Sequence, residues 1–189
     1  MQRSKSSSEE GQPVFKNERD TYQFKWEDIG DINGGRPNLG NTMNVAVYRL
    51  MQYTLRDVLI KTLSVDKANE VLREAGNLAG REFCLNALDR TLPFGEFVAM
   101  LQEKLLQLKI GILRIEKSDL ERMEFLLTVE EDLDCSGLPI LGETVCEYDE
   151  GFIAGVLATY TGKRFDVREI DCWASGARVC RFCVKQIDG

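Results

Sequence analysis

Three cysteines and one glutamate in the last third of the chain have the side chains that a tetrahedral zinc site requires: Cys146, Glu169, Cys172 and Cys180. They lie on a segment predicted to form a helix followed by a β-hairpin. With three thiolates and one carboxylate, the protein would fill all four positions around the ion. A closed site of this kind is structural, because it leaves no open position for an activated water. The four residues therefore favour a metal-stabilised binding domain over an enzyme.

The strand that begins at Arg164 predicts which way its side chains face. Phe165 and Val167 face the core, so alternation turns Glu169 inward as well. A carboxylate on an apolar face is costly unless it is paired, protonated or bound to a metal. Cys172 has the opposite parity to Glu169, so both can reach one ion only if the strand bulges or turns between them.

The remaining cysteines separate into ligands and core residues. Cys180 shares the inner face of the last strand, whereas Cys183 lies on the outer face, which argues against a zinc knuckle formed by the pair. Whether Cys183 replaces Glu169 as a ligand stays open at this point. Cys146 begins a helix, whose dipole favours a thiolate. The alternative for every cysteine is a small buried side chain, and this is the interpretation of Cys84 and Cys135.

Charge and composition exclude several functions. The net charge of −7 leaves no basic face for phosphate contacts, so no nucleic-acid partner is expected. The chain has no histidine, which removes Ser-His and Cys-His catalysis and the commonest general base. No catalytic residues are predicted, and the expectation is that the protein is not an enzyme.

The apolar segments are too short for a membrane protein. Residues 1–10 are polar and lack the apolar core of a signal peptide, and the longest apolar stretch, 152–158, cannot span a bilayer. We therefore expect a cytoplasmic protein with no membrane partner. In that compartment cysteines are reduced, buried or metal-bound more often than disulfide-bonded.

The elements that must position the four residues follow from hydrophobic periodicity. Residues 1–20 are predicted to be a disordered polar tail, and residues 21–189 a single domain. The predicted helices span about 43–63, a stretch opened by Ser64 and Asp66, a third that starts at Pro93, and 145–161. The second helix is expected to bury Val71, Leu72, Ala75, Leu78, Ala79 and Phe83, and the last to present the small residues Gly151, Ala154, Gly155 and Ala158 to a neighbour.

The predicted strands cover 22–26, 112–117, 123–130, 164–172 and 179–187, with a loop over 30–40. In the strand 123–130, Glu124, Thr128 and Glu130 are expected to face water. Helices come first, then strands, then a helix, then strands. This order indicates an α+β fold in which an antiparallel sheet packs against a helical layer.

The C-terminal segment resembles a known family. Residues 146–157, followed by Cys172, Gly176 and 180–184, resemble the 4-vinyl-reductase-type domain, a small-ligand-binding module that also forms the sensor half of phenol-responsive transcription activators. Members of this family look like distant relatives of TRAPP-type vesicle-tethering subunits. The strong match covers about residues 143–187.

The resemblance implies a site and a pocket. In the phenol sensors Cys, Glu, Cys and Cys hold a structural zinc, and the spacing of Cys146, Glu169, Cys172 and Cys180 matches that set without gaps. The zinc would clip the C-terminal helix to the β-hairpin. By analogy, the apolar ligand pocket between helices and sheet would involve Phe97, Met100, Leu101, Phe125, Phe152 and Trp173. The resemblance also implies a homodimer.

The departures from the family restrict the function. The phenol sensors hold the phenolic hydroxyl with a pocket histidine, which this chain lacks, so phenol itself is not expected. The chain carries no ATPase or helix-turn-helix domain, so its output would pass through another regulatory protein. The leading hypothesis is a stand-alone, sensor-like domain for a hydrocarbon-like or aromatic small molecule. The alternatives are a homodimeric assembly module without a ligand, and an accessory factor in the reduction of a tetrapyrrole vinyl group.

Overall fold

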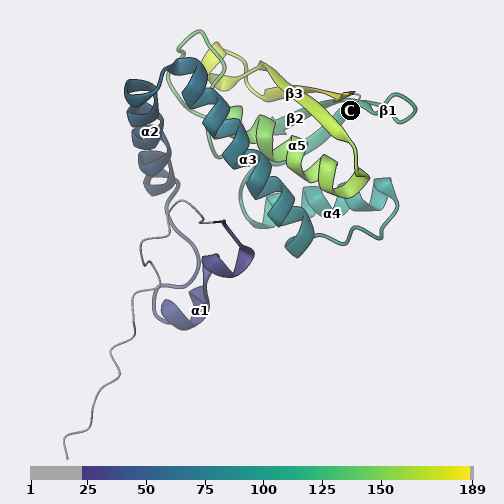
Figure 1. The fold of residues 1–189 in the computed structure, drawn as a ribbon. Helices are drawn as coiled ribbons and strands as arrows, with labels where there is room; N and C mark the ends of the chain where they lie inside the picture. The colour runs from purple at the N-terminus through teal and green to yellow at the C-terminus, as the bar shows by residue number, and fades with distance from the viewer. Residues whose placement is uncertain (1–22, 188–189) are drawn as a thin grey trace, which may run out of the picture.

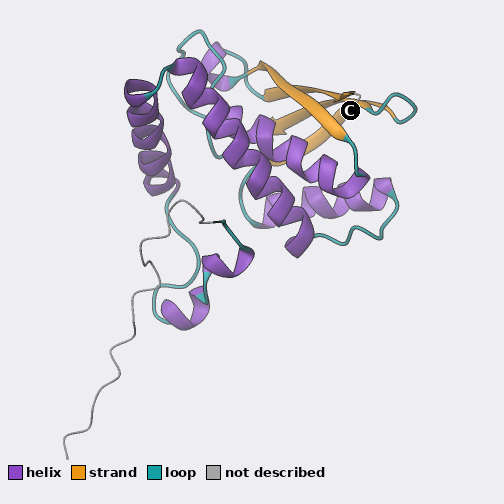
Figure 2. Ribbon diagram, in the orientation of Figure 1, coloured by secondary structure: helices purple, strands orange, loops and turns teal. Residues whose placement is uncertain are grey.

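Four strands form one fully antiparallel sheet in the order β1-β2-β4-β3 (Figure 2). The structure is a computed structural model that describes residues 23–187, so the predicted tail over 1–20 lies outside the described residues. The strands are β1 (Ile112–Asp119), β2 (Glu124–Glu130), β3 (Arg164–Asp171) and β4 (Cys180–Ile187). The α+β class and the antiparallel sheet are confirmed.

Four long helices accompany the sheet: α2 (Val45–Thr62), α3 (Val65–Ala87), α4 (Phe94–Gln107) and α5 (Glu147–Thr161). The predicted helices match them to within a few residues. Helix α5 ends at Gly162, whose φ of 73° suits a left-handed C-cap. Helix α5 lies between α3 and the sheet (Figure 1). Within residues 23–187, no helix is both long and apolar enough to cross a bilayer.

Helices α3 and α5 touch through glycines on both sides. The predicted small-residue face of α5 is present, because Gly151 and Gly155 lie against the backbone of α3. The predicted buried stripe of α3 is wrong: Val71 is 39% exposed, whereas Gly76 and Gly80 are buried against α5. The size of the side chain, rather than its hydrophobicity, decides which residues of α3 meet α5, since the two backbones come into direct contact.

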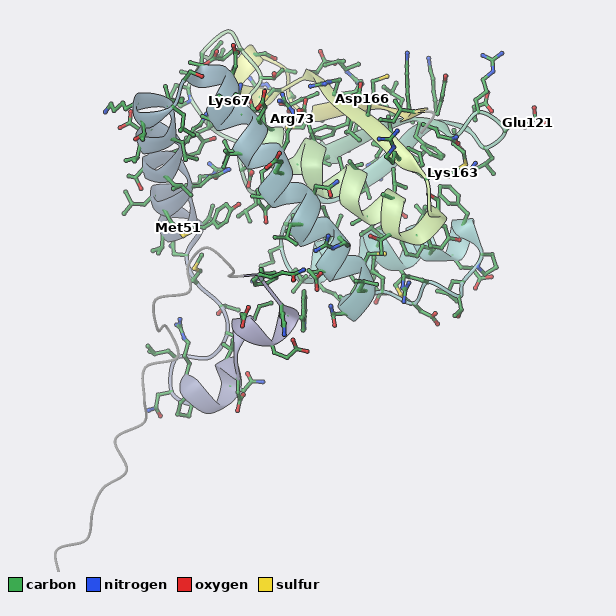
Figure 3. The ribbon with its side chains drawn as sticks, in the orientation of Figure 1. Met51, Lys67, Arg73, Glu121, Lys163 and Asp166 are labelled. Carbon is green, nitrogen blue, oxygen red and sulfur yellow. The ribbon has the colours of Figure 1, made fainter. Side chains whose placement is uncertain are left out.

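Helix α2 lies at the edge of the domain and buries none of its residues (Figures 1 and 3). Polar side chains attach it instead. Tyr48 and Gln52 donate hydrogen bonds to the Asp134 carboxylate at 2.8 and 2.7 Å, and Arg56 pairs with Glu147 at 2.6 Å. Its apolar residues, including Met51, labelled in Figure 3, therefore remain exposed.

The strand predicted over residues 22–26 is wrong in its described part. Trp26 begins the short 3₁₀ helix η2 (Trp26–Ile29), and the predicted loop contains the four-residue helix α1 (Ile32–Gly35). Two aspartates explain the helical turns. Asp28 accepts a hydrogen bond from the backbone N–H of Lys25, and Asp31 accepts one from Gly34. Such local side-chain bonds compete with an extended backbone.

The central strands pack more tightly than their alternation predicts. Cys180, Phe182 and Val184 are buried on the inner face of β4, as expected. Thr128 was expected to face water but is only 4% exposed. It lies on the central strand β2 between Arg114 of β1 and Arg181 of β4, and long arginine stems cover a small neighbour.

Candidate functional site

Four buried cysteines converge at one end of the sheet. The Sγ atoms of Cys135, Cys146, Cys172 and Cys180 all lie within 4.8 Å of one another. Cys135 lies in the loop after β2, Cys146 is the N-cap of α5, Cys172 directly follows β3, and Cys180 is the first residue of β4. The cluster therefore joins the last helix to both strands of the C-terminal hairpin.

The sulfur geometry fits a tetrahedral ion. Zn–S bonds of about 2.3 Å place neighbouring sulfurs about 3.8 Å apart. The Sγ of Cys146 lies 3.8 Å from that of Cys172 and 3.9 Å from that of Cys180. Cys135 and Cys180 are closer, at 3.0 Å, which is still well beyond an S–S bond of about 2.05 Å. Four free, buried thiols at these distances can hold one soft metal ion.

Local hydrogen bonds hold the loop cysteine in place. Asp132 Oδ1 accepts hydrogen bonds from the backbone N–H groups of Asp134, at 2.8 Å, and Cys135, at 3.1 Å. Arg49 of α2 donates to the Leu133 carbonyl at 2.7 Å. These bonds shape the turn that carries Cys135, so the loop is ordered by its own aspartate and by α2 together.

Glu169 lies beside the cluster rather than in the set of four sulfurs. The strand shifts register between Glu169 and Asp171, at the place where a bulge was predicted. Glu169 Oε2 accepts a hydrogen bond from the backbone N–H of Cys146 at 3.1 Å, and Oε1 is buried with no hydrogen-bond partner. Burial, reinforced by the negative charge of Cys172, raises the pKa of Glu169 to about 8. Glu169 is thus a fifth donor group next to four sulfurs.

The other two cysteines lie elsewhere. Cys183 is partly exposed on the outer face of β4, opposite Leu126 and Arg168, as its parity predicted. Cys84 is buried in a separate apolar cluster around Phe97. Sequence reasoning missed Cys135 as a member of the site, because a loop has no periodicity from which to assign a facing. Its nearest sequence signal is the aspartate three residues earlier, which can cap such a turn.

A cavity of about 60 Å³ lies between α4, α5 and the sheet. Its volume is several times the minimum for one water molecule. Apart from Gly111 and two aspartates, apolar and aromatic side chains line it. Among the six predicted pocket residues, Phe97, Leu101, Phe125 and Phe152 line this cavity.

The other two predicted pocket residues do not line the cavity. Met100 packs in the cluster around Phe97, where its sulfur accepts a hydrogen bond from the backbone N–H of Asp89 at 3.3 Å. Trp173 lies beyond the cysteine cluster, donates to the Leu138 carbonyl at 3.1 Å and stacks under Arg178. Their chain positions gave no indication of this difference.

Two aspartates connect the cavity to the cysteine cluster. Asp132 and Asp149 both line the cavity, and their carboxylate oxygens lie within 4.8 Å of each other and of the Cys146 sulfur. Burial raises the pKa of Asp149 well above its usual value, and the nearby carboxylates of Asp134 and Asp132 raise it further. Burial and Asp134 likewise raise the pKa of Asp132 to about 7. The metal-binding end of the domain and the cavity therefore share a wall.

Known proteins share this fold. The family model of the vinyl-4-reductase domain matches residues 125–186, a range that contains the four clustered cysteines and Glu169. An uncharacterized protein of Methanocaldococcus jannaschii, MJ0150, is 26% identical over 162 residues, which cover 84% of this chain and 87% of that protein.

Two solved structures are similar at low identity. The phenol-responsive sensory domain of the transcription activator PoxR, solved with phenol, has a TM-score of 0.57 at 15% identity, over 76% of this chain and 75% of that chain. A trafficking protein particle complex subunit 3 from Naegleria fowleri, covalently bound to palmitic acid, has a TM-score of 0.61 at 13% identity, over 77% and 96%. At such identities the similarity establishes the fold. The chain therefore contains a vinyl-4-reductase domain, as its resemblance to the 4-vinyl-reductase type implied.

Proposed function

We propose that this chain is a stand-alone, sensor-like domain that binds an apolar or aromatic small molecule in the cavity between α4, α5 and the sheet. The observation that carries the proposal is the cavity itself, whose walls are apolar apart from Asp132 and Asp149. A largely apolar cavity with few polar groups is the usual form of a small-molecule site. The two similar structures were solved with phenol and with palmitic acid, both largely apolar compounds.

A structural zinc ion is the second part of the proposal. Cys146, Cys172 and Cys180, the three thiols predicted from the sequence, would hold it together with Cys135. Four thiolates favour zinc or iron, and zinc is the common structural ion in such a set. Glu169 is the alternative fourth ligand, since its free Oε1 is buried beside the sulfurs. When bound, the ion would supply cross-linking of the helix to the hairpin.

The proposed role is binding without catalysis. Among the described residues that line the cavity, the titratable groups are the two aspartates, and no serine, cysteine or lysine accompanies them. A nucleophile with an adjacent base, the usual arrangement in covalent catalysis, is not formed by these side chains. We propose that a further regulatory protein receives the signal of ligand binding.

Ligand binding is expected to raise the melting temperature. An apolar compound at about 100 times its Kd should add about 2.7 kcal/mol of stability, or several degrees in a domain of this size. The measurement is a thermal-shift screen of aromatic and aliphatic compounds. Val98→Phe, which fills the cavity, should abolish the response, whereas Val71→Phe on the exposed face of α3 should retain it. Wild-type protein that responds to no compound would argue against a ligand-binding function.

We also propose that α2 mediates a homodimer. It buries none of its own residues in the single chain, although a stripe of large apolar side chains runs along it. These residues are 50 to 67% exposed and comprise Val47, Leu50, Met51, Leu55 and Val58. A contiguous apolar patch of this kind marks an interaction surface, and a second copy presents the same patch.

Light scattering at micromolar concentration is expected to give the mass of a dimer. Leu50→Glu should shift it to that of a monomer, because a charge would be buried in the contact. Leu106→Glu replaces a similarly exposed leucine on α4 and should leave the mass unchanged. A wild-type monomer would refute the dimer.

A further inference from the structure

Three acidic residues in the first turn of α5 are treated differently by the fold. Glu147 pairs with Arg56 at 2.6 Å, and Glu150 pairs with Arg73. Asp149 lies between them in the sequence and has no ion pair among residues 23–187. Its Oδ2 is buried without a hydrogen-bond partner. The chain thus supplies a cation to each glutamate but not to the aspartate that lines the cavity.

A second carboxylate strengthens the demand for a cation at this position. The carboxylate oxygens of Asp132 and Asp149 lie within 4.8 Å of each other, and Asp132 forms no ion pair within the described residues either. Asp132 Oδ1 is occupied by two backbone N–H groups, from Asp134 and Cys135. Two buried carboxylates this close are costly to keep without a positive partner. One neutral hydroxyl would satisfy one oxygen and leave the charge in place.

We propose that the cavity selects a compact apolar amine, whose ammonium group is held between Asp149 and Asp132 while its hydrocarbon part fills the aromatic end. This inference rests on the proposed ligand-binding function and names the class of ligand. An ammonium group has three donors and one positive charge, which match two carboxylates. The volume of about 60 Å³ is far below that of a pocket for drug-sized ligands. A single ring or a short branched chain is the size that fits.

The test compares three probes that share one ring: benzylamine, benzyl alcohol and toluene. Binding to the full chain is measured at pH 7, by calorimetry for the first two and by thermal shift for all three. We expect benzylamine to bind at least about tenfold more tightly than benzyl alcohol, since hydrogen bonds to charged groups contribute more than neutral ones. In Asp149→Asn, which keeps the shape of the side chain, this ratio should fall to about one. Asp66→Asn, at an exposed position of α3, should leave it unchanged.

Three outcomes would overturn the inference. If toluene or benzyl alcohol binds as well as benzylamine, the cavity binds ligands but does not select amines, and the proposed function stands without this refinement. If benzylamine is preferred equally by the Asp149→Asn variant, the amine binds elsewhere. If none of the three probes binds, both the inference and the ligand-binding function fail.

Discussion

The substitution Gly151→Ala is expected to destabilise the domain by about 3 kcal/mol or more, or to prevent folding. A Cβ atom at this position would lie less than 3.0 Å from the Arg73 carbonyl of α3. Gly155 faces the Asn77 carbonyl in the same way, and Gly76 and Gly80 of α3 face carbonyls of α5. Backbone atoms cannot rotate aside as a side chain can, so the helices must separate. That separation would open packing along the whole contact.

Chemical denaturation of purified variants would measure the effect, with Gly95→Ala as the matched control. Gly95 lies in α4, and a Cβ there would meet no atom within 4 Å. Because alanine is the better helix former, this control should gain about 0.5 kcal/mol. If Gly151→Ala proved as stable as the control, the close contact of α3 and α5 would be wrong.

Removing the metal is expected to have the second large effect. A structural zinc site contributes on the order of 10 kcal/mol of binding free energy to folding, comparable to the whole stability of a small domain. Wild-type protein treated with a strong chelator should therefore melt at a much lower temperature or unfold. Cys172→Ser, which removes one thiolate from the cluster, should behave like the chelated protein.

The control for Cys172→Ser is Cys183→Ser, because Cys183 is partly exposed on the outer face of β4 and contacts none of the clustered sulfurs in the described structure. Its melting temperature should stay near that of the wild type, since surface substitutions cost little. Circular dichroism melts with and without chelator would measure both variants. Equal melting of the two variants would mean that the clustered cysteines are ordinary core residues.

Much of the metal centre could be predicted from alternation along strands and from the start of a helix. Glu169 and Cys180 face inward by parity, the bulge after Glu169 brings Cys172 around, and Cys146 is the N-cap of α5. These are local properties of regular elements. Cys135 lies in a loop, where no period applies, and only tertiary contacts with α2 and β4 bring it to the cluster.

The cavity was harder to predict than the fold. The aromatic residues Phe97, Phe125 and Phe152 follow from their places on inward faces. Asp149 did not, because an acid in the first turn of a helix is usually a solvated partner of the dipole. Helix α5 lies between α3 and the sheet, so its polar residues are buried too. That arrangement depends on glycine contacts in α3, which hydrophobic periodicity does not register.

The most direct test of the metal centre is native mass spectrometry of untagged protein, with the metal identified by elemental analysis. We expect one zinc ion per chain in the wild type and in Glu169→Gln, and none in Cys135→Ser. Zinc that is lost from Glu169→Gln but kept in Cys135→Ser would contradict the four-cysteine site and restore Glu169 as the fourth ligand. Metal-free wild-type protein that stays folded would contradict the zinc site altogether.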